Sequence, residues 1–364
     1  MSKKKIKEVD AKKVFKTLNP NKVWIPILLG LGIVFYLFYS DPNMSASKLK
    51  LVFDAEASAI ILAFLVLLTR DIGYVYRIRT LTGEKLSWKS SIQVILLWEF
   101  ASAVTPSAVG GTAVAIFILL KEGLKFGKSL AYVMLTAILD NLFFVLSAPL
   151  VFLFIGGDVF ANLSAGSTQF KYGFSIVFII SYSLIAIYTL IMAYALFVRP
   201  RAFKWLLIKA TGLGFLRRWR HQAVEQGNEM ILASHEMRGK TASYWLKISL
   251  ATVFIWCARY AMLNSLIAAF TDINFLEHMV VFSKQIIMWI IMLISPTPGS
   301  SGTAELSFNQ FFAVYLGDYT LVANICWRLL SYYLYLFIGA FILPRWIRRV
   351  FFTKKNKNKV YELD

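Results

Sequence analysis

Six predominantly apolar stretches constrain the fold of this chain more than any other feature. Five of them reach or approach the roughly 20 residues that a helix needs to cross a bilayer, and they are Val23–Tyr39, Ser129–Ile155, Tyr172–Val198, Ser243–Phe270 and Thr320–Leu343. The sixth, Ala55–Thr69, is shorter but continues into Gly73 and Tyr74. The chain is 58% hydrophobic and 16% charged, well above the apolar share of a soluble domain. The sequence therefore predicts an all-α polytopic membrane protein with six full spans.

The formal net charge of +19 is gathered beside the predicted spans, not on a face that would bind nucleic acid. Basic segments at residues 1–22 and 344–364 flank the first and last spans. By the positive-inside rule both termini lie in the cytoplasm, where they meet anionic lipid. Arg70, Arg77 and Arg79 follow the second span and are expected in a cytoplasmic loop. The plasma membrane is the expected location, and nucleic acid is not an expected partner.

The loops that follow fit this orientation, because a loop with no basic residues precedes one that is rich in them. Residues 156–171 form the predicted external loop, because Gly156–Phe170 contains no Lys or Arg. Residues 199–240 are rich in both and are expected inside. Apolar residues among these cations, such as Trp205 and Leu206, are typical of an interfacial amphipathic helix. A solvated cytoplasmic loop is the alternative interpretation of this segment.

Two breaks that contain proline and glycine interrupt further apolar stretches: TPSAVGGTA at Thr105–Ala113 and TPGSSGTAE at Thr297–Glu305. The pieces beside them are short, and Thr112–Leu120 spans only about 14 Å as a helix, roughly half of the hydrocarbon core. Each region returns to the face that it left, and the second begins outside, near Lys284. Two crossings or one re-entrant hairpin satisfy this parity, and the lengths favour re-entrant helical hairpins.

The chain then divides into two halves with one plan, residues 23–155 and residues 172–343. Each half runs span, span, hairpin, span, with the hairpins at residues 90–120 and 279–316. An odd number of crossings per half inverts the second half, so the hairpins enter from opposite faces and their tips meet near mid-membrane. Matching breaks of this kind are the best sequence indication of a transporter's binding site. We therefore expect the two breaks to form the two sides of one cavity.

The breaks also supply candidate binding residues. These are Pro106, Gly110, Gly111 and Thr112 in the first break, and Pro298, Gly299 and Gly302 in the second. Proline removes an amide donor, and glycine lets the chain turn and a ligand approach the backbone. We expect helices to start at Thr112 and Thr303 with unpaired amides facing the cavity, where an anion such as phosphate is favoured. The alternative is that both loops only kink packed helices.

Five ionisable residues lie within apolar stretches: Glu99, Asp140, Arg259, Glu305 and Arg328. A charge at the centre of a membrane costs a few kcal/mol unless it is paired or hydrated, so each is a functional candidate. We expect Arg259 and Arg328 to hold an anionic headgroup through bidentate contacts with phosphate, and Glu99, Asp140 and Glu305 to serve in charge pairing or proton coupling. A purely structural network of ion pairs is an equally weighted alternative.

Catalytic patterns are not found in the sequence. His221, His235 and His278 are scattered over segments expected on opposite faces, so neither a metal site nor a Ser-His-Asp set is predicted. A Walker motif for ATP-driven transport is also missing. We expect a protein that is not an enzyme and that needs no cofactor.

The sequences TPSAVGGTAVAIFILLKEG and PTPGSSGTAEL resemble the paired signatures of the lysylphosphatidylglycerol synthase transmembrane (flippase-like) family. The resemblance extends from about the second span to the last. Pro106, Gly110 and Gly111 match the first signature, and the matches to the second are Pro296, Pro298, Gly299, Gly302 and Glu305. Only about twenty residues follow the last span, so the soluble synthase domain of that family is not expected here.

The resemblance implies a translocase that moves an anionic or zwitterionic lipid headgroup across the membrane, with that lipid as substrate. Two alternatives remain open from the sequence: a secondary transporter of a small anion, and a non-transporting accessory subunit of an envelope-lipid enzyme. The sequence does not indicate the oligomeric state.

Overall fold

The computed structural model describes residues 50–105, 107–160, 168–212, 217, 220–295 and 297–353. Every regular element in these ranges is a helix, and they contain no β-strand. The predicted first span at Val23–Tyr39, the basic N-terminal segment before it and the end of the basic C-terminal tail lie outside the described residues.

Twelve α-helices make up most of the described chain. They are α4 (Ala57–Leu81), α5 (Trp88–Val104), α6 (Ser107–Lys121), α7 (Phe126–Ile155), α8 (Thr168–Ala193), α9 (Pro200–Ala210), α10 (Arg220–Arg238), α11 (Ala242–Ala268), α12 (Phe275–Met292), α13 (Thr303–Leu316), α14 (Thr320–Arg328) and α15 (Leu334–Ile347). The short 3₁₀ helices are η2 (Lys50–Asp54), η3 (Gly156–Val159) and η6 (Gly317–Tyr319), and the π-helical turns are η4 (Tyr194–Val198), η7 (Leu329–Tyr333) and η8 (Arg348–Thr353).

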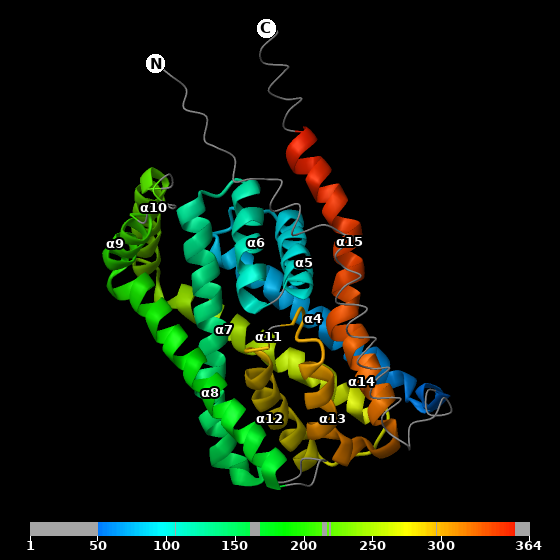
Figure 1. The fold of residues 1–364 in the computed structure, drawn as a ribbon. Coiled ribbons are helices and arrows are strands. Elements are labelled where there is room, and N and C mark those ends of the chain that lie inside the picture. Colours follow the sequence, from blue (N-terminus) through cyan, green and yellow to red (C-terminus); the bar gives the residue numbers. More distant parts are fainter. Residues whose placement is uncertain are drawn as a thin grey trace, which may run out of the picture.

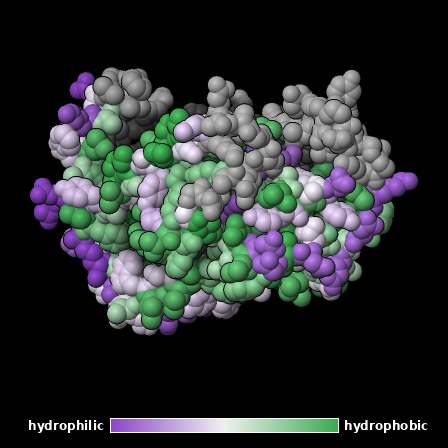
Figure 2. Space-filling model, turned by 90° about the horizontal axis from the view of Figure 1, so that it is seen from below, coloured by the Kyte–Doolittle hydropathy of each residue, from purple (hydrophilic) through white to green (hydrophobic). Residues whose placement is uncertain are grey.

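Six helical runs of the described chain are long and apolar enough to cross a membrane. They are Ala57–Leu81, Phe126–Ile155, Tyr172–Val198, Ala242–Ala268, Phe275–Met292 and Thr303–Val350. Hydrophobic side chains cover much of the surface, and hydrophilic ones gather mainly toward its sides in the view of Figure 2. The chain is therefore a multi-pass membrane protein.

Helices α4 and α11 pack against each other through the middle of the molecule, and the other helices are arranged around them (Figure 1). Gly73 makes this contact close, because a Cβ atom there would lie 2.8 Å from Cγ1 of Ile255. The pair α5–α6 lies toward the end of the molecule that holds α9 and α10, and the pair α12–α13 lies toward the opposite end (Figure 1). Helix α5 packs against α15, and α12 packs against α7. Each helix pair thus rests on a helix from the other part of the chain.

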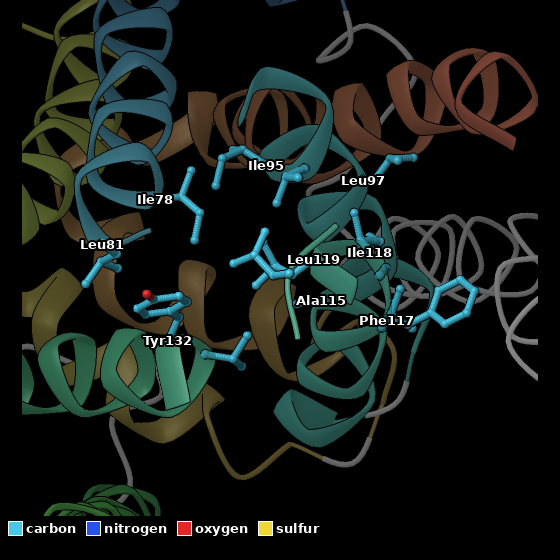
Figure 3. Packing of buried hydrophobic residues seen from close by; sticks show 14 of the residues in the cluster. Ile78, Leu81, Ile95, Leu97, Ala115, Phe117, Ile118, Leu119 and Tyr132 are labelled. Atoms are coloured by element: carbon cyan, nitrogen blue, oxygen red, sulfur yellow. The ribbon is translucent and has the colours of Figure 1, made fainter. Parts of the chain in front are cut away.

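Buried apolar side chains form two clusters. The first joins α5, α6, the start of α7 and the end of α15, and Figure 3 shows part of it, including Leu97, Ile118 and Phe117. The second joins α12, α13 and α14 to the first half of α4 and to the second halves of α7 and α11. The polar groups described below lie between these two clusters.

Helix α4 differs from the second span expected from the sequence, because it continues to Leu81. Arg70 and Arg77, which were predicted to lie in a cytoplasmic loop, are therefore buried within the helix. The helix contains no proline, and it ends where Thr82 and Gly83 follow. Arginines are tolerated inside a span when they find acidic partners, and both do so here.

The two helix pairs also differ from the prediction. Helix α6 starts at Ser107 instead of Thr112, so Gly110 and Gly111 are helical. Continuing the helix satisfies backbone groups that hydrocarbon would leave unpaired. Helix α12 is 18 residues long and long enough to cross, whereas the sequence pieces had suggested a segment too short to do so. It also contains Lys284, which is buried and does not mark an external loop.

The segment 199–240 folds into α9 and α10, which pack against each other, so the helical interpretation fits better than a solvated loop. Trp205 and Leu206 of α9 are exposed, and Lys209 lies over the Trp205 ring. Helix α10 is joined to α7 by two ion pairs, Lys125 with Glu229 at 2.9 Å and Lys128 with Glu236. The hydrogen bond from Lys128 lowers the pKa of the Glu236 carboxyl.

Candidate functional site

A cavity of ≈ 330 Å³ lies between the inner ends of α5–α6 and α12–α13. Ser102, Thr105 and Thr112 line it from the first helix pair, and Ser295 and Gly299 line it from the second. The remaining walls come from α4, α7, α11, α14, η7 and α15. Residues of both sequence breaks therefore line one cavity, although they are nearly two hundred residues apart in the chain.

Arg259 of α11 lies in the cavity wall among aromatic rings. Its guanidinium carbon is 5.1 Å from the ring centre of Trp256 and 4.9 Å from that of Trp289. Nη2 donates to the Tyr74 hydroxyl at 3.2 Å and reaches Oε1 of Glu99 at 3.5 Å, while Nε is buried and has no partner among the described residues. Arg259 is thus held mainly by ring stacking, with a hydrogen-bond donor to spare.

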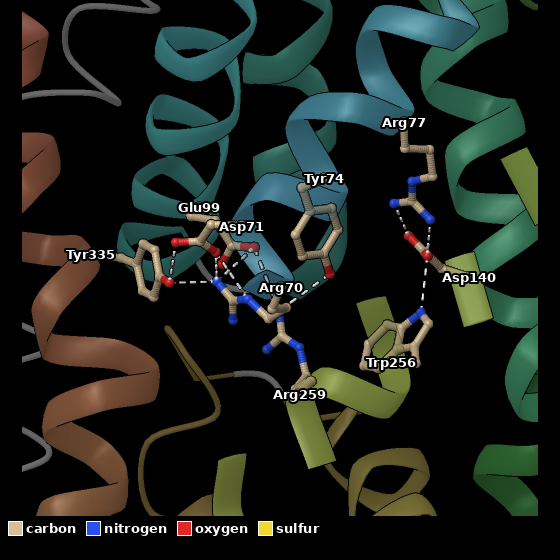
Figure 4. A network of polar contacts seen from close by, with 9 residues as sticks. All are labelled: Arg70, Asp71, Tyr74, Arg77, Glu99, Asp140, Trp256, Arg259 and Tyr335. Carbon is tan, nitrogen blue, oxygen red and sulfur yellow. Dashed lines mark hydrogen bonds and ion pairs between the residues drawn. The ribbon is translucent and has the colours of Figure 1, made fainter. Parts of the chain in front are cut away.

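Arg70 of α4 lies beside Glu99 and is fully buried (Figure 4). Its Nη2 is 2.5 Å from Oδ1 of Asp71 and 3.8 Å from Oε1 of Glu99, and it donates to the Tyr335 hydroxyl at 2.6 Å. The Tyr335 hydroxyl in turn donates to Oδ2 of Asp71 at 2.7 Å. Arg70 therefore ties α4 to α5 and α15 and shares Glu99 with Arg259.

Arg77 and Asp140 form a second ion pair of the cavity wall (Figure 4). The contact is bidentate, with Nη1 to Oδ1 at 2.5 Å and Nη2 to Oδ2 at 3.1 Å. Arg77 also donates to the Thr252 hydroxyl at 3.0 Å, and the Trp256 indole donates to Oδ1 of Asp140 at 3.0 Å. Planar, bidentate pairs of this type are among the stronger charge contacts, so α4, α7 and α11 are firmly joined here.

Arg328 and Glu305 form a third pair at the start of α13. Nε of Arg328 is 2.8 Å from Oε1 of Glu305, and both side chains are buried. The guanidinium also donates to the Gly299 carbonyl and to the Ser301 hydroxyl, each at 3.2 Å. Oε2 of Glu305 accepts from the Gly302 amide at 2.6 Å. The pair thereby fixes the loop between α12 and α13.

Tyr332 of η7 links the inner ends of the two helix pairs. Its hydroxyl donates to the Ala103 carbonyl of α5 at 3.1 Å, and the Arg328 guanidinium lies 4.1 Å from its ring centre. Gly299 lies against the same ring, because a Cβ atom there would come within 1.9 Å of it. The tyrosine therefore contacts both sides of the gap between α5 and the second break.

The predicted site residues divide into two groups. Those that line the cavity are Glu99, Thr112, Asp140, Arg259, Gly299 and Arg328. Those placed in helices or turns outside its lining are Gly111, Pro298, Gly302 and Glu305. Gly110 lies within α6. Gly111 allows close packing of α6 on α5, since a Cβ atom there would lie 2.3 Å from the Ser102 hydroxyl. Pro106 and Pro296 lie outside the described residues.

The described contacts at the two expected helix starts differ from the unpaired amides that the sequence predicts. Thr112 lies in the middle of α6. At the start of α13, the Gly302 amide donates to Glu305 and the Ala304 amide donates to the Ser300 carbonyl at 2.8 Å. A carboxylate of the protein therefore occupies the place where an anionic ligand was expected, and it interacts favourably with the positive end of the helix dipole.

Sequence reasoning missed Arg70, Asp71, Arg77 and the aromatic residues that surround the charges. The sequence did contain a usable signal, since Arg70, Tyr74 and Arg77 are spaced four and three residues apart. That spacing places them on one face of a helix. Extending the second span past Thr69 would have placed all three within the membrane.

Comparisons with known proteins agree with this architecture. The model of the Lysylphosphatidylglycerol synthase TM region family matches residues 23–339. A protein of Archaeoglobus fulgidus described as "UPF0104 membrane protein" is 27% identical over 333 residues, a match that covers 87% of this chain and 94% of that protein. The family match includes both helix pairs and every charged residue of the cavity wall. The chain therefore belongs to the lysylphosphatidylglycerol synthase transmembrane-region family.

Proposed function

We propose that this protein is a lipid translocase of the plasma membrane that passes a lipid headgroup through the central cavity while the acyl tails remain in the bilayer. The observation that carries the proposal is the cavity between α5–α6 and α12–α13, lined by arginines, carboxylates and aromatic rings. Buried charges at this depth are retained where they serve a pathway or a ligand. A role in handling membrane lipid also fits the family to which the chain belongs.

In this proposal α5–α6 and α12–α13 are re-entrant hairpins of two inverted halves, and α12, although long enough to cross, turns back into α13 beside the cavity. Three contacts support that arrangement: α4 packs on its counterpart α11, α5 packs on α15, and α12 packs on α7. In each of the last two contacts, the first helix of one half's hairpin packs on the last span of the other half. Rocking of one half against the other around a fixed site is the usual way in which such transporters alternate access.

The orientation that we propose places α9, α10 and both termini in the cytoplasm. The described basic residues of 199–240 and those at the end of α15 lie at the same end of the molecule (Figure 1). The exposed Trp205 and the neighbouring Lys209 of α9 suit contact with anionic lipid at that surface.

Transfer of headgroup-labelled phospholipid by purified protein in proteoliposomes tests the proposal. Ser331→Trp fills part of the cavity, because Ser331 lines it, and should reduce transfer at least about tenfold. Ser183→Trp is the matched control, since Ser183 is exposed on α8, away from the cavity, and should leave transfer unchanged. Absence of transfer by the wild-type protein, or equal transfer by both variants, would contradict the proposal.

A further inference from the structure

We propose that the cavity binds a zwitterionic phosphoamine headgroup, with the phosphate at Arg259 and the ammonium at Asp140. This inference rests on the proposed function, because it assumes that the ligand enters as part of a lipid. It goes further by naming the chemical class of the headgroup and the place of each charge.

The charges with access to the cavity are of both signs. The side chains of Glu99 and Asp140 are 21% and 20% exposed, and that of Arg259 is 11% exposed. The other two lining arginines are withdrawn, with Arg77 2% and Arg328 4% exposed. A purely anionic ligand would therefore meet two carboxylates for each accessible guanidinium, whereas a zwitterion finds a partner for each of its poles.

Arg259 is the arginine best prepared to take a phosphate. Its contacts to Tyr74 and Glu99 both use Nη2, and the contact to Glu99 is long, at 3.5 Å. Nε has no partner among the described residues although it is buried. A phosphate oxygen accepting from this guanidinium would satisfy that donor, and the planar fork suits a bidentate contact. The Nε of Arg328 also makes no aligned hydrogen bond among the described residues. Arg328 differs because this Nε already lies 2.8 Å from the buried carboxylate of Glu305.

Asp140 supplies the opposite pole. Its Oδ2 accepts one hydrogen bond among the described residues, from Nη2 of Arg77 at 3.1 Å, and a carboxylate oxygen has room for a second. Phe144 and Trp256 line the cavity beside it. An ammonium group on Oδ2 would thus meet a negative charge and nearby ring faces, the two features that favour binding of an amine.

The two poles are separated by a single side chain. The ring of Trp256 lies 5.1 Å from the Arg259 guanidinium carbon, and its indole nitrogen donates to Asp140 at 3.0 Å (Figure 4). A cavity of ≈ 330 Å³ is at the small end of the roughly 300–1,000 Å³ of known ligand pockets. It suits a headgroup without its acyl chains.

The balance of charge points the same way. The ion pairs form two neighbouring groups: Arg70, Asp71, Glu99 and Arg259 in one, and Arg77 with Asp140 in the other. Each group has as many arginines as acids, so its formal charge is zero. A zwitterion leaves that balance unchanged inside the membrane. A net anion or cation would add an uncompensated charge, which is costly at this depth.

Binding of soluble headgroups to the purified full-length protein tests the inference without transport. By titration calorimetry, glycerophosphoethanolamine should bind at least about tenfold more tightly than glycerophosphoglycerol, which has the phosphate but no amine; tenfold corresponds to about 1.4 kcal/mol. Arg259→Gln should weaken both, and Asp140→Asn should weaken only the amine-containing compound. Because Asp140→Asn leaves Arg77 unpaired and threatens folding, Glu99→Gln provides a second variant that should reduce the same preference. Equal affinities, tighter binding of the glycerol compound, or no binding of either would overturn the inference.

A parallel transfer assay separates this inference from the proposed function and distinguishes a lipid from a free solute. In proteoliposomes, phosphatidylethanolamine with a free amine and its label on an acyl chain should cross about tenfold faster than phosphatidylglycerol labelled in the same way. Glycerophosphoethanolamine should slow that transfer without itself accumulating in the vesicles. Selective binding without lipid transfer would defeat the translocase proposal and leave the headgroup assignment standing. Rapid transfer of both lipids at the same rate would support the translocase proposal and overturn the headgroup assignment.

Discussion

Arg259 and Arg328 line the same cavity, yet their surroundings differ. Arg259 lies against the rings of two tryptophans that also contact each other, with Glu99 at 3.5 Å and a buried Nε that lacks a partner among the described residues. Arg328 lies 2.8 Å from the buried Glu305 and also donates to the loop that precedes α13. Both arginines carry the same charge in similar sequence settings. The geometry assigns the first to the cavity and the second to the fold.

The difference teaches that a charge within a span becomes informative only when its partners are known. An arginine that is ion-paired with a buried carboxylate and donates to a backbone carbonyl and a hydroxyl holds the protein together, and its loss leaves the carboxylate without a partner. An arginine with a donor to spare can be replaced at smaller cost to the fold. Stability measurements therefore separate the two regions before any ligand is identified.

The largest effect is expected for Glu305→Ala. The change removes the partner of Arg328 and the acceptor for the Gly302 amide in a fully buried place, so the free energy of unfolding should fall by about 3–5 kcal/mol. Steric trapping in bicelles measures it. Glu277→Ala is the matched control, because Glu277 accepts from the Asn274 amide at the same helix position of α12 but near the surface. It should cost about 1 kcal/mol, and similar losses at both sites would refute the structural role of Glu305.

Gly299→Ala should have the second largest effect. The glycine has φ of 57°, and an added Cβ would come 1.9 Å from the Tyr332 ring. Backbone strain and overpacking together should lower the free energy of unfolding by about 2–4 kcal/mol. Gly317→Ala isolates the strain, because its φ is 52° and no atom lies within 4 Å of the added Cβ. If the two variants melted alike, the contact between Tyr332 and the second break would be wrong.

Arg259→Gln comes next and tests the difference between Arg259 and Arg328 most directly. Glu99 keeps Arg70 at 3.8 Å, so no carboxylate is left alone and the loss should be about 1–2 kcal/mol, mostly from ring stacking. Arg328→Gln, which strands Glu305, should lose about 3 kcal/mol or more in the same assay. For headgroup binding we expect the opposite order. Arg259→Gln should reduce the affinity more than Arg328→Gln does, although it costs less stability. Equal stability losses would remove the distinction between the two arginines.

The sequence was sufficient to predict a helical membrane protein and to locate the two breaks. It also located the charged residues within the apolar stretches, which are Glu99, Asp140, Arg259, Glu305 and Arg328. Apolar length and proline or glycine content are local properties, so they can be read along the chain. The pairings could not be read in that way. Asp140 meets Arg77 across 63 residues, and the Tyr335 hydroxyl meets Asp71 across 264. Such contacts depend on which helices become neighbours.

The start of α6 was mispredicted for a related reason. Two consecutive glycines usually weaken a helix in water, and the sequence therefore favoured a loop up to Thr112. In the structure Gly110 and Gly111 are helical, and Gly111 packs closely on Ser102 of α5. Small residues allow such close helix contacts in membranes. The same residues signal a turn or a tight helix contact, and only the neighbouring helix distinguishes them.

The smallest effect is expected at the surface pair of Lys128 and Glu236. This pair joins a cation and a carboxylate as the buried pairs do, but it is partly exposed to solvent. Glu236→Gln should lower the free energy of unfolding by less than about 1 kcal/mol at pH 7. The Lys128 contact lowers the folded-state pKa of Glu236, so its contribution is present above the unfolded value of about 4.3 and is lost as the pH falls through the folded value. The difference between wild type and variant should therefore vanish on acidification. A loss as large as that of Glu305→Ala, or a difference that grows at low pH, would mean that the position of an ion pair relative to the membrane does not set its energetic role.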